Sequence, residues 1–307
     1  MRVILAGATG AIGRPLIRHL KDAGHAVFGL ARSAESARAP SEAGAGAITA
    51  DALNAPAVRA AIARIRPDAV INELTALPAH HTAAEMQAAA ARDYKVRVEG
   101  NANLLAAIAE AGVRRYILQS SGFWYAPGAG LADESEQFAF NATPGISASA
   151  RSYEELESSA SQTPGIEFVA LRYGFFYGPG TWYCSEGDMG DQVRRQLVPV
   201  IGTGEGVWSW VHIEDAAAAT VAALECAPGV FNVVDSDPTP QYVFLPAFAR
   251  AVGAAEPPRI TEQQALDSFG ADQVYYATRL RGASNAKAMR ELHFQPRPLE
   301  WLHQARR

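Results

Sequence analysis

The sequence predicts a doubly wound α/β fold, in which helices cover both faces of a parallel sheet. Three observations carry this prediction. Short apolar runs alternate with helical patterns, a glycine-rich turn separates the first run from the first helix, and 307 residues suffice for one large core. The runs expected as strands are residues 3–6, 26–31, 47–50, 69–72, 116–119 and 167–172.

Helices are expected between these runs. Apolar residues recur at helical spacing from residue 12 to 23, and Gly24 follows as a stop signal. After Tyr173 the alternation loosens, although it continues with shorter elements. The further expected elements are helices at 54–65, 84–111, 147–161 and 214–226, strands at 207–212 and 230–233, and a linker at 254–262.

The change of pattern after residue 172 predicts a large domain with a small C-terminal lobe. Residues 1–172 form the expected domain, and residues 207–235 return a strand and a helix to it. Residues 173–206 and 236–307 form the expected lobe, whose last four residues should fray.

Composition excludes several classes of protein. The net charge is −5, from 27 basic and 32 acidic residues that are interspersed, so we do not expect nucleic acid as a partner. No apolar run reaches about 18 residues, so no membrane span is expected. Cys184 and Cys226 lack metal spacing, and His80-His81 has no carboxylate or thiolate at useful spacing, so no metal is expected. The chain starts directly in a strand, and a reduced, cytoplasmic location is predicted.

The most specific motif is GATGAIG at residues 7–13, which follows a strand and opens a helix. Gly7 allows a tight turn, Gly10 lets the backbone approach a pyrophosphate, and Gly13 lets the helix pack on the sheet. The free N–H groups and the dipole of the helix start attract the anion. This motif predicts a dinucleotide-binding domain of the Rossmann type.

The end of the second strand favours NADP(H), with NAD as the other possibility. NAD-binding proteins usually place an acid there, but this chain has Ala31 followed by Arg32. A guanidinium suits a 2′-phosphate in charge and geometry, although Arg32 as a solvated loop charge stays open. Asp51, after the third strand, is expected either to accept from the adenine amino group or to cap the next helix, which Asn54 also can do.

The ordered motifs together resemble the extended, atypical short-chain dehydrogenase/reductases of the NAD-dependent epimerase/dehydratase family. The resemblance implies a Rossmann domain, a small-molecule substrate and a possible homodimer through the helices at 85–111 and 147–161. The segments that carry it are GATGAIG at 7–13, ADAL at 50–53, VEGNANLLAAIAEAGVRRYILQSS at 98–121, LRYGFFYGPG at 171–180, SWVHIEDAAAA at 209–219 and VFNVVD at 230–235.

The resemblance also implies the residues of a site. Ser121 matches the active-site hydroxyl better than Ser120 does, because Tyr125 keeps the family's offset from Ser121. The implied cofactor contacts, besides Arg32, are Gly7, Thr9, Gly10, Ala11, Ile12, Gly13, Asp51, Ala52, Leu53, Leu74, Thr75, Ala76, Tyr173, Gly174, Phe175 and Phe176.

The catalytic helix departs from the family. Relatives carry a Tyr that moves a proton and, four residues on, a Lys that lowers the Tyr pKa and holds the nicotinamide ribose. Here the helix reads SARSYEELE at 149–157. In one register Tyr153 is the catalytic Tyr and Glu157 replaces the Lys, where a carboxylate would raise the Tyr pKa. In the other, which we prefer, Ser149 replaces the Tyr, Tyr153 replaces the Lys, and Glu157 matches a further family acid. The first register requires a larger deletion before Arg172.

Tyr153 is the first candidate for proton transfer, and Ser121 is expected to hold the substrate oxygen. Glu73 is either a base or a buried, paired charge. Aromatic residues at 173–189, with Trp208 and Trp210, are expected either to line a pocket for an apolar or aromatic substrate or to pack the lobe. The other possible proton donors are Tyr125, Tyr173, Tyr177 and His212.

These features lead us to expect an NADP(H)-dependent oxidoreductase or epimerase-like enzyme that acts on a small carbonyl or hydroxyl compound. Two alternatives stay open. The missing Tyr–Lys pair is compatible with a non-catalytic NADP(H)-binding sensor or regulator. The family resemblance is compatible with a nucleotide-sugar epimerase or dehydratase that retains NAD.

Overall fold

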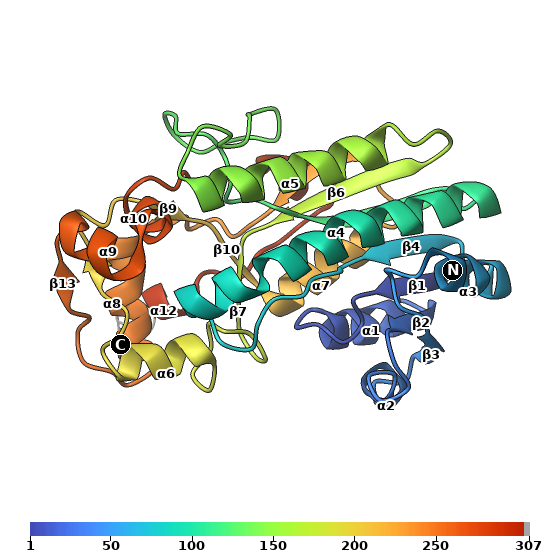
Figure 1. Cartoon of the computed structure of the whole chain (residues 1–307), viewed down its shortest axis with the longest axis horizontal. Coiled ribbons are helices and arrows are strands. Elements are labelled where there is room, and N and C mark those ends of the chain that lie inside the picture. The colour runs from blue at the N-terminus through green and yellow to red at the C-terminus, as the bar shows by residue number, and fades with distance from the viewer. Residues whose placement is uncertain (304–307) are drawn as a thin grey trace.

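Seven parallel strands form the central sheet of the computed structural model, which describes residues 1–303 (Figure 1). Their order is β11-β6-β5-β4-β1-β2-β3, which confirms the predicted doubly wound sheet. The end expected to fray, residues 304–307, lies outside the described residues. The strands are β1 (Arg2–Ala6), β2 (Ala26–Ala31), β3 (Gly46–Thr49), β4 (Ala69–Asn72), β5 (Arg115–Ser121), β6 (Glu167–Tyr173) and β11 (Gly229–Val233).

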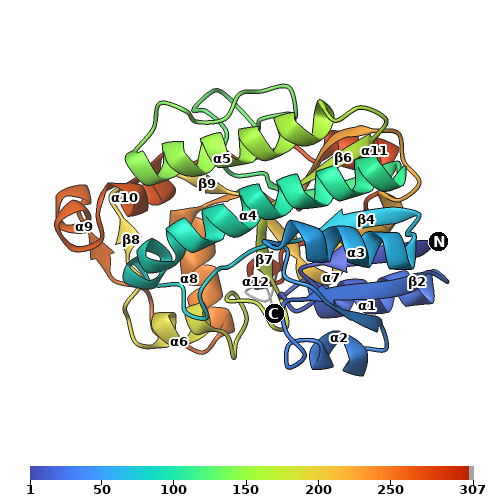
Figure 2. The ribbon, with the colours of Figure 1, turned by 45° about the vertical axis from the view of Figure 1, so that its right-hand side comes forward.

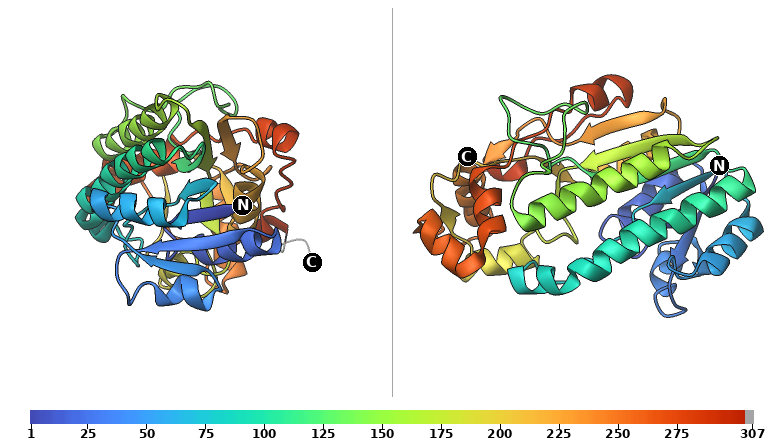
Figure 3. Two further views of the ribbon diagram at one scale, coloured as in Figure 1. Left: turned by 90° about the vertical axis from the view of Figure 1, so that its right-hand side faces the viewer. Right: turned by 45° about the horizontal axis from the view of Figure 1, so that its top comes forward.

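Helices cover both faces of this sheet because side chains alternate along each strand. Val3 and Leu5 of β1 pack on the side of α1 (Gly13–Asp22) and α7 (Ile213–Ala222), whereas Ile4 packs on the opposite side. That opposite face is covered by α3 (Ala55–Ile65), α4 (Ala83–Ala111) and α5 (Pro144–Ser161), and an end-on view separates the layers (Figure 3).

The order of the strands reverses next to β1, which pairs with β2 on one side and with β4 on the other. Connections leave such a pair of strands in opposite directions, so a crevice opens at their carboxyl ends. The glycine motif follows β1 and residues 73–76 follow β4, so both border this crevice.

The remaining elements form a lobe at one end of the sheet, on the left in Figure 1. Its helices are α6 (Asp188–Arg194), α8 (Gln241–Ala251), α9 (Glu262–Phe269), α10 (Ala271–Thr278) and α12 (Glu300–His303). Its short strands are β7 (Phe175–Tyr177), β8 (Val200–Ile201), β9 (Val207–Trp208), β10 (Trp210–His212), β12 (Thr239–Pro240) and β13 (Arg259–Ile260). The individual helices of this lobe were not predicted, nor were two further short helices, α2 (Arg38–Glu42) and α11 (Ala286–Glu291). The division of the chain at residue 172 stays a prediction.

Two local expectations were wrong. The single strand expected at 207–212 is interrupted at the buried Ser209, so that β9 pairs with β12 and β10 pairs with β7. The reason is that Ser209 bonds two other segments: its carbonyl accepts from N–H of Phe175, and its hydroxyl accepts from N–H of Ala283. The linker expected at 254–262 contains β13, which pairs with β8.

The long helix α4 begins beside the lobe and runs across the sheet, with α5 alongside it (Figures 1 and 2). The two helices pack against each other. Side chains from their middle turns therefore meet near the crevice. None of the described helices has the length and apolar character needed to cross a membrane.

Candidate cofactor and substrate site

The turn after β1 admits only glycine at its first position. Gly7 has a φ of 88°, and a methyl group there would collide with the carbonyl oxygen of Glu73. A methyl group on Gly13 would collide with the carbonyl of Ala8, so the helix start lies directly on the strand end. The turn is closed by a bond of 2.9 Å from N–H of Gly10 to the carbonyl of Gly7.

The first turn of α1 is open to an anion. Ile12 stands at the N-cap and supplies no side-chain hydrogen bond, and the first turn carries no acidic residue. Thr9, Gly10 and Ala11 are exposed in front of it. Pro15 has no N–H and that of Gly13 donates to the carbonyl of Gly10, so the N–H of Arg14 and the positive end of the helix dipole are what the first turn offers to a diphosphate. These residues therefore fit the diphosphate of a dinucleotide.

The end of β2 carries a free cation. Arg32 is exposed and makes no hydrogen bond or ion pair within residues 1–303. The next residues form a tight turn in which the hydroxyls of Ser33 and Ser36 lie 3.1 Å apart. The guanidinium is therefore available to a ligand, and its contact with a 2′-phosphate stays a prediction.

The structure assigns the cap of α3 to Asn54, whose side chain accepts from N–H of Ala57 at 3.1 Å. Asp51 is exposed, and its Oδ1 accepts from N–H of Leu53 at 3.0 Å. The cap is therefore provided without Asp51, and the adenine contact of Asp51 stays a prediction.

Helix α4 anchors the loop after β4. N–H of Ala76 donates to Oδ1 of Asp93 on α4 at 2.6 Å. Further along α4, Gly100 faces Leu74 and Ala52, and a methyl group there would come within 2.8 Å of Cδ1 of Leu74. The structure thus brings together the predicted segments 51–53 and 74–76 over one face of α4.

Glu73 is a buried acid directly behind the glycine turn. The hydroxyl of Tyr173 donates to its Oε1 at 3.1 Å and lies 2.6 Å from the hydroxyl of Thr220. Burial raises the pKa of Glu73 to about 8, against the opposing effects of the Tyr173 hydrogen bond and the Arg97 charge. Its other oxygen, Oε2, is buried without a partner among the described residues.

The two serines at the end of β5 have different surroundings. The hydroxyl of Ser120 donates to Oε1 of Glu157 at 2.5 Å. The hydroxyl of Ser121 is buried and has no partner among the described residues. Buried hydroxyls are normally hydrogen-bonded, so that of Ser121 is available to a ligand. Its catalytic role stays a prediction.

Glu157 belongs to a buried ion pair. Arg172 donates two hydrogen bonds to its carboxylate, from Nε to Oε1 at 2.8 Å and from Nη2 to Oε2 at 2.7 Å. Nη1 of Arg172 donates to the hydroxyl of Tyr125 at 2.8 Å, and that hydroxyl donates to Asn232. Both carboxylate oxygens are therefore used within the fold, and the register of α5 stays a prediction.

Tyr153 lies on α5 beside a cation that the sequence analysis missed. The guanidinium of Arg97, from α4, lies 5.1 Å from the ring centroid of this half-buried residue. Burial raises the pKa of Tyr153, and the charge of Arg97 partly offsets this. A signal existed in the sequence, since Arg97 follows Asp93 by four residues and precedes Gly100 by three, on the face that proves to be buried.

The aromatic residues divide into a lobe core and a partly exposed wall. Trp208, Trp210 and Tyr183 are buried, and they pack the lobe together. Phe123 and Phe175 stay partly exposed and stack with their ring centroids 4.1 Å apart, and Phe175 also stacks on Trp208 at 4.3 Å. The packing interpretation therefore describes the first group and also Phe175, whose ring is stacked between Phe123 and Trp208. Phe123 is the ring of this set that is left to contact a flat apolar group.

Four other predicted proton donors are engaged within the fold. As described above, the hydroxyl of Tyr125 donates to Asn232 and that of Tyr173 donates to Glu73. The hydroxyl of Tyr177 donates to the carbonyl of Pro298 at 3.4 Å, and Nδ1 of His212 accepts from N–H of Glu214 as the cap of α7.

The loop before α4 is tied to the lobe. N–H of His81 donates to Oδ2 of Asp188 at 2.7 Å, and Nδ1 of His80 lies 2.8 Å from Oδ1 of the same carboxylate. The indole of Trp182 donates to the carbonyl of Ala79 at 2.9 Å. Within residues 1–303, no group of three or more His, Cys, Asp or Glu side chains is placed to hold a metal ion.

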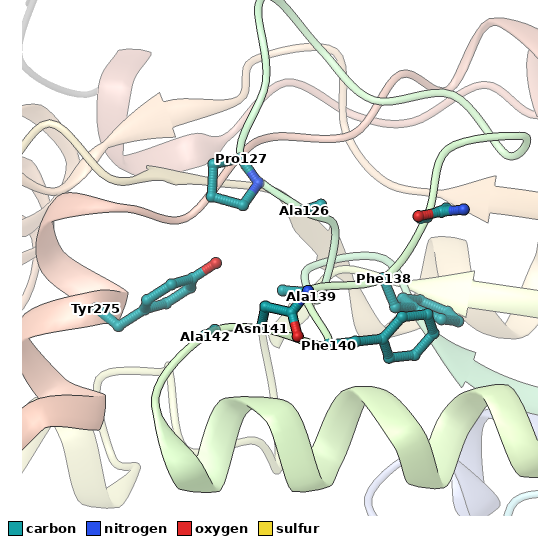
Figure 4. A pocket seen from close by; sticks show the side chains of 9 residues that line it. Ala126, Pro127, Phe138, Ala139, Phe140, Asn141, Ala142 and Tyr275 are labelled. Atoms are coloured by element: carbon teal, nitrogen blue, oxygen red, sulfur yellow. The ribbon is translucent and has the colours of Figure 1, made fainter.

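A separate cavity of about 140 Å³ lies ahead of the N-terminus of α5 (Figure 4). The hydroxyl of Tyr275 is buried there without a partner among the described residues. The volume is too small for a dinucleotide, so this cavity is not the cofactor site. It is lined by Ala126, Pro127, Gln137, Phe138, Ala139, Phe140, Asn141, Ala142 and Tyr275.

Comparisons with known proteins agree with this geometry. The model of the NAD dependent epimerase/dehydratase family matches residues 3–233. A Streptomyces protein named 3-diazoavenalumate denitrifying reductase is 38% identical over 304 residues, which is 98% of each chain. The UDP-glucose 4-epimerase of Thermus thermophilus, solved with NAD, has a TM-score of 0.72 at 24% identity and covers 97% of this chain and 94% of its own. A human epimerase family protein, solved with NADPH, has a TM-score of 0.73 at 22% identity, with 98% and 97% covered. The two solved structures share the fold.

Proposed function

We propose a function for this chain on the premise that it belongs to the NAD dependent epimerase/dehydratase family. Within that family of NAD(P)-binding enzymes, we assign it to the reductases. Its proposed reaction transfers a hydride from NADPH to an aryl diazo compound and releases N2.

The observation that carries this proposal is the missing proton-transfer pair on α5. Reduction of a carbonyl to an alcohol must place a proton on the oxygen, and the family performs this with Tyr and Lys. Here Ser149 and Tyr153 stand in the preferred register instead, and Glu157 is bound to Arg172. A reaction that consumes no proton matches such a helix.

Diazonium reduction is such a reaction. Bound NADPH supplies a hydride, and an aryl diazonium ion plus NADPH gives the arene, N2 and NADP⁺. The hydride forms the new C–H bond, and the electron pair of the broken C–N bond leaves with N2. Atoms and charge balance without a proton, so no residue has to act as a general acid.

The relative at 38% identity supports the diazo substrate. Its name describes a diazo compound, the loss of nitrogen and a reduction, and the match covers 98% of both chains. The proposed aromatic character of the substrate is also based on this chain, because the half-buried ring of Phe123, which stacks on Phe175, is proposed to contact the substrate ring. The unpartnered hydroxyl of Ser121 is proposed to donate to a polar atom of the substrate.

The preference for NADP(H) is part of the proposal. The free guanidinium of Arg32 and the lack of an acid at Ala31 favour a 2′-phosphate. NAD stays the competing cofactor.

Reduction of an aromatic carbonyl is the second candidate. Tyr153 favours it, because the residue is only half-buried and the guanidinium of Arg97 lies near its ring. In that reaction Tyr153 would deliver the proton and Ser121 would hold the oxygen.

The test is a turnover assay with NADPH deuterated at the transferable position and a para-substituted benzenediazonium salt. We expect N2 release and one deuterium in the arene, at the carbon that carried nitrogen, above the rate measured with heat-treated protein. Turnover of aromatic aldehydes or ketones alone would establish the second candidate and overturn the first. Cofactor binding without turnover of either class would favour the sensor. Tightly retained NAD in the purified protein would favour the nucleotide-sugar enzyme.

Tyr153→Phe separates the two reductions. If the diazo reaction needs no proton, this variant should keep kcat within about threefold of the wild type. If a carbonyl is reduced, loss of the phenol should lower kcat by roughly a hundredfold, the usual size of general acid catalysis. Ser158→Ala, on the same helix, is the matched control.

A further inference from the structure

Arg97 joins two parts of the site that lie far apart in the sequence. Its guanidinium lies 5.1 Å from the ring centroid of Tyr153 on α5. Its Nε donates to Oδ2 of Asp93 at 2.7 Å, and Oδ1 of Asp93 accepts from N–H of Ala76 at 2.6 Å. The cation is therefore held between α5 and the loop after β4.

This cation has unused hydrogen-bond donors. Within residues 1–303, only Nε of Arg97 donates a hydrogen bond, which leaves Nη1 and Nη2 free. The side chain is only 7% exposed. Neither Nη atom is among the fully buried side-chain atoms that lack a partner in the described residues, so both can be reached by a ligand that accepts hydrogen bonds.

The surroundings indicate which ligand lies there. The α4 face that carries Arg97 also carries Gly100, which packs under Leu74 and Ala52. Glu73, which lies within electrostatic range of Arg97, is directly behind Gly7 of the diphosphate turn. The guanidinium therefore lies between Tyr153 and the acid behind the diphosphate turn.

We propose that Arg97 is a cofactor-binding residue whose Nη groups donate to the nicotinamide riboside half of bound NAD(P). In this proposal Arg97 on α4 supplies the positive charge that relatives carry as a Lys on the helix that corresponds to α5. Asp93 has a positioning role, because it orients the guanidinium and anchors Ala76 at once. This inference rests on NAD(P) binding and is independent of the diazo substrate.

The test compares two ligands by calorimetric titration of the purified protein. NADPH contains the nicotinamide riboside, whereas ADP contains only the adenosine and diphosphate. Arg97→Met should weaken NADPH binding about tenfold or more and leave ADP binding within about twofold, since charge-assisted hydrogen bonds are lost only with NADPH. Arg97→Lys, which keeps the charge, should recover part of the NADPH affinity. Lys95→Met, an exposed position on the same helix, should change neither.

Equal losses of NADPH and ADP affinity in Arg97→Met, or no loss of either, would overturn the inference. If thermal unfolding shows that Arg97→Met does not fold, Arg97→Lys provides the test, because it also should weaken NADPH selectively. Failure of the wild type to bind NADPH and NADH would overturn both this inference and the proposed function. Normal cofactor binding without diazo turnover would overturn the proposed function alone.

Discussion

The turn after β1 and the middle of α5 border the same site, but only the first follows the family pattern. The turn is determined by backbone sterics, because Gly7 and Gly13 lie against carbonyl groups that leave no room for a side chain. The α5 segment is determined by side chains, and there Ser149 and Tyr153 stand where relatives in the preferred register carry Tyr and Lys. In this chain the turn that depends on backbone sterics keeps the glycine pattern of the family, whereas the side chains of α5 depart from its Tyr and Lys.

The largest effect on cofactor binding is expected from Gly7→Ala. The added methyl group collides with the carbonyl of Glu73 and also strains a positive φ, so the turn must move away from the diphosphate. Titration should show at least a roughly hundredfold loss of NADPH affinity, which equals about 2.7 kcal/mol. Gly24→Ala is the matched control, since it has a φ of 81° but nothing within 4 Å. Equal losses in the two variants would contradict the steric argument.

Arg172→Met tests the α5 side of the comparison. It leaves the buried carboxylate of Glu157 without its cation, which should lower the free energy of unfolding by about 3–5 kcal/mol in urea denaturation. The control is Arg114→Met, which breaks an exposed pair with Glu167 and should cost less than about 1 kcal/mol. Similar costs for both variants would show that the buried pair does not stabilise α5.

A smaller effect is expected at the far end of the cofactor site. Arg32→Ala should weaken NADPH binding about tenfold and NADH binding less than about twofold, because only NADPH carries the 2′-phosphate. Titrations at low and high salt should show the difference shrinking, since the contact is exposed. Equal effects on both cofactors would remove the case for a phosphate contact.

Much of the fold follows from local patterns in the sequence. The strand and helix periods predicted the sheet, because each element buries one face or is buried throughout. The helix α2 was missed because it has only five residues and contains Pro40. The break at Ser209 was missed because it depends on bonds to Phe175 and Ala283, which are distant in sequence.

The site was predictable to the extent that it is local. The glycine turn is visible in the sequence because its constraint acts between neighbouring residues. The position of Arg97 beside Tyr153 depends on how α4 packs on α5, and the missing partner of the Ser121 hydroxyl is visible only in the folded chain. The NADP(H) preference, the homodimer and the cytoplasmic location stay predictions.

The ties between the β4–α4 loop and the lobe have a thermodynamic consequence. Ala79 and His81 are bonded to Trp182 and Asp188, and the same loop contains Ala76 at the cofactor crevice. A ligand in the lobe that tightens these bonds favours one arrangement of the loop. If that arrangement also binds the dinucleotide better, each ligand must raise the affinity of the other by the same factor, so substrate and cofactor binding would be reciprocally coupled through a few hydrogen bonds.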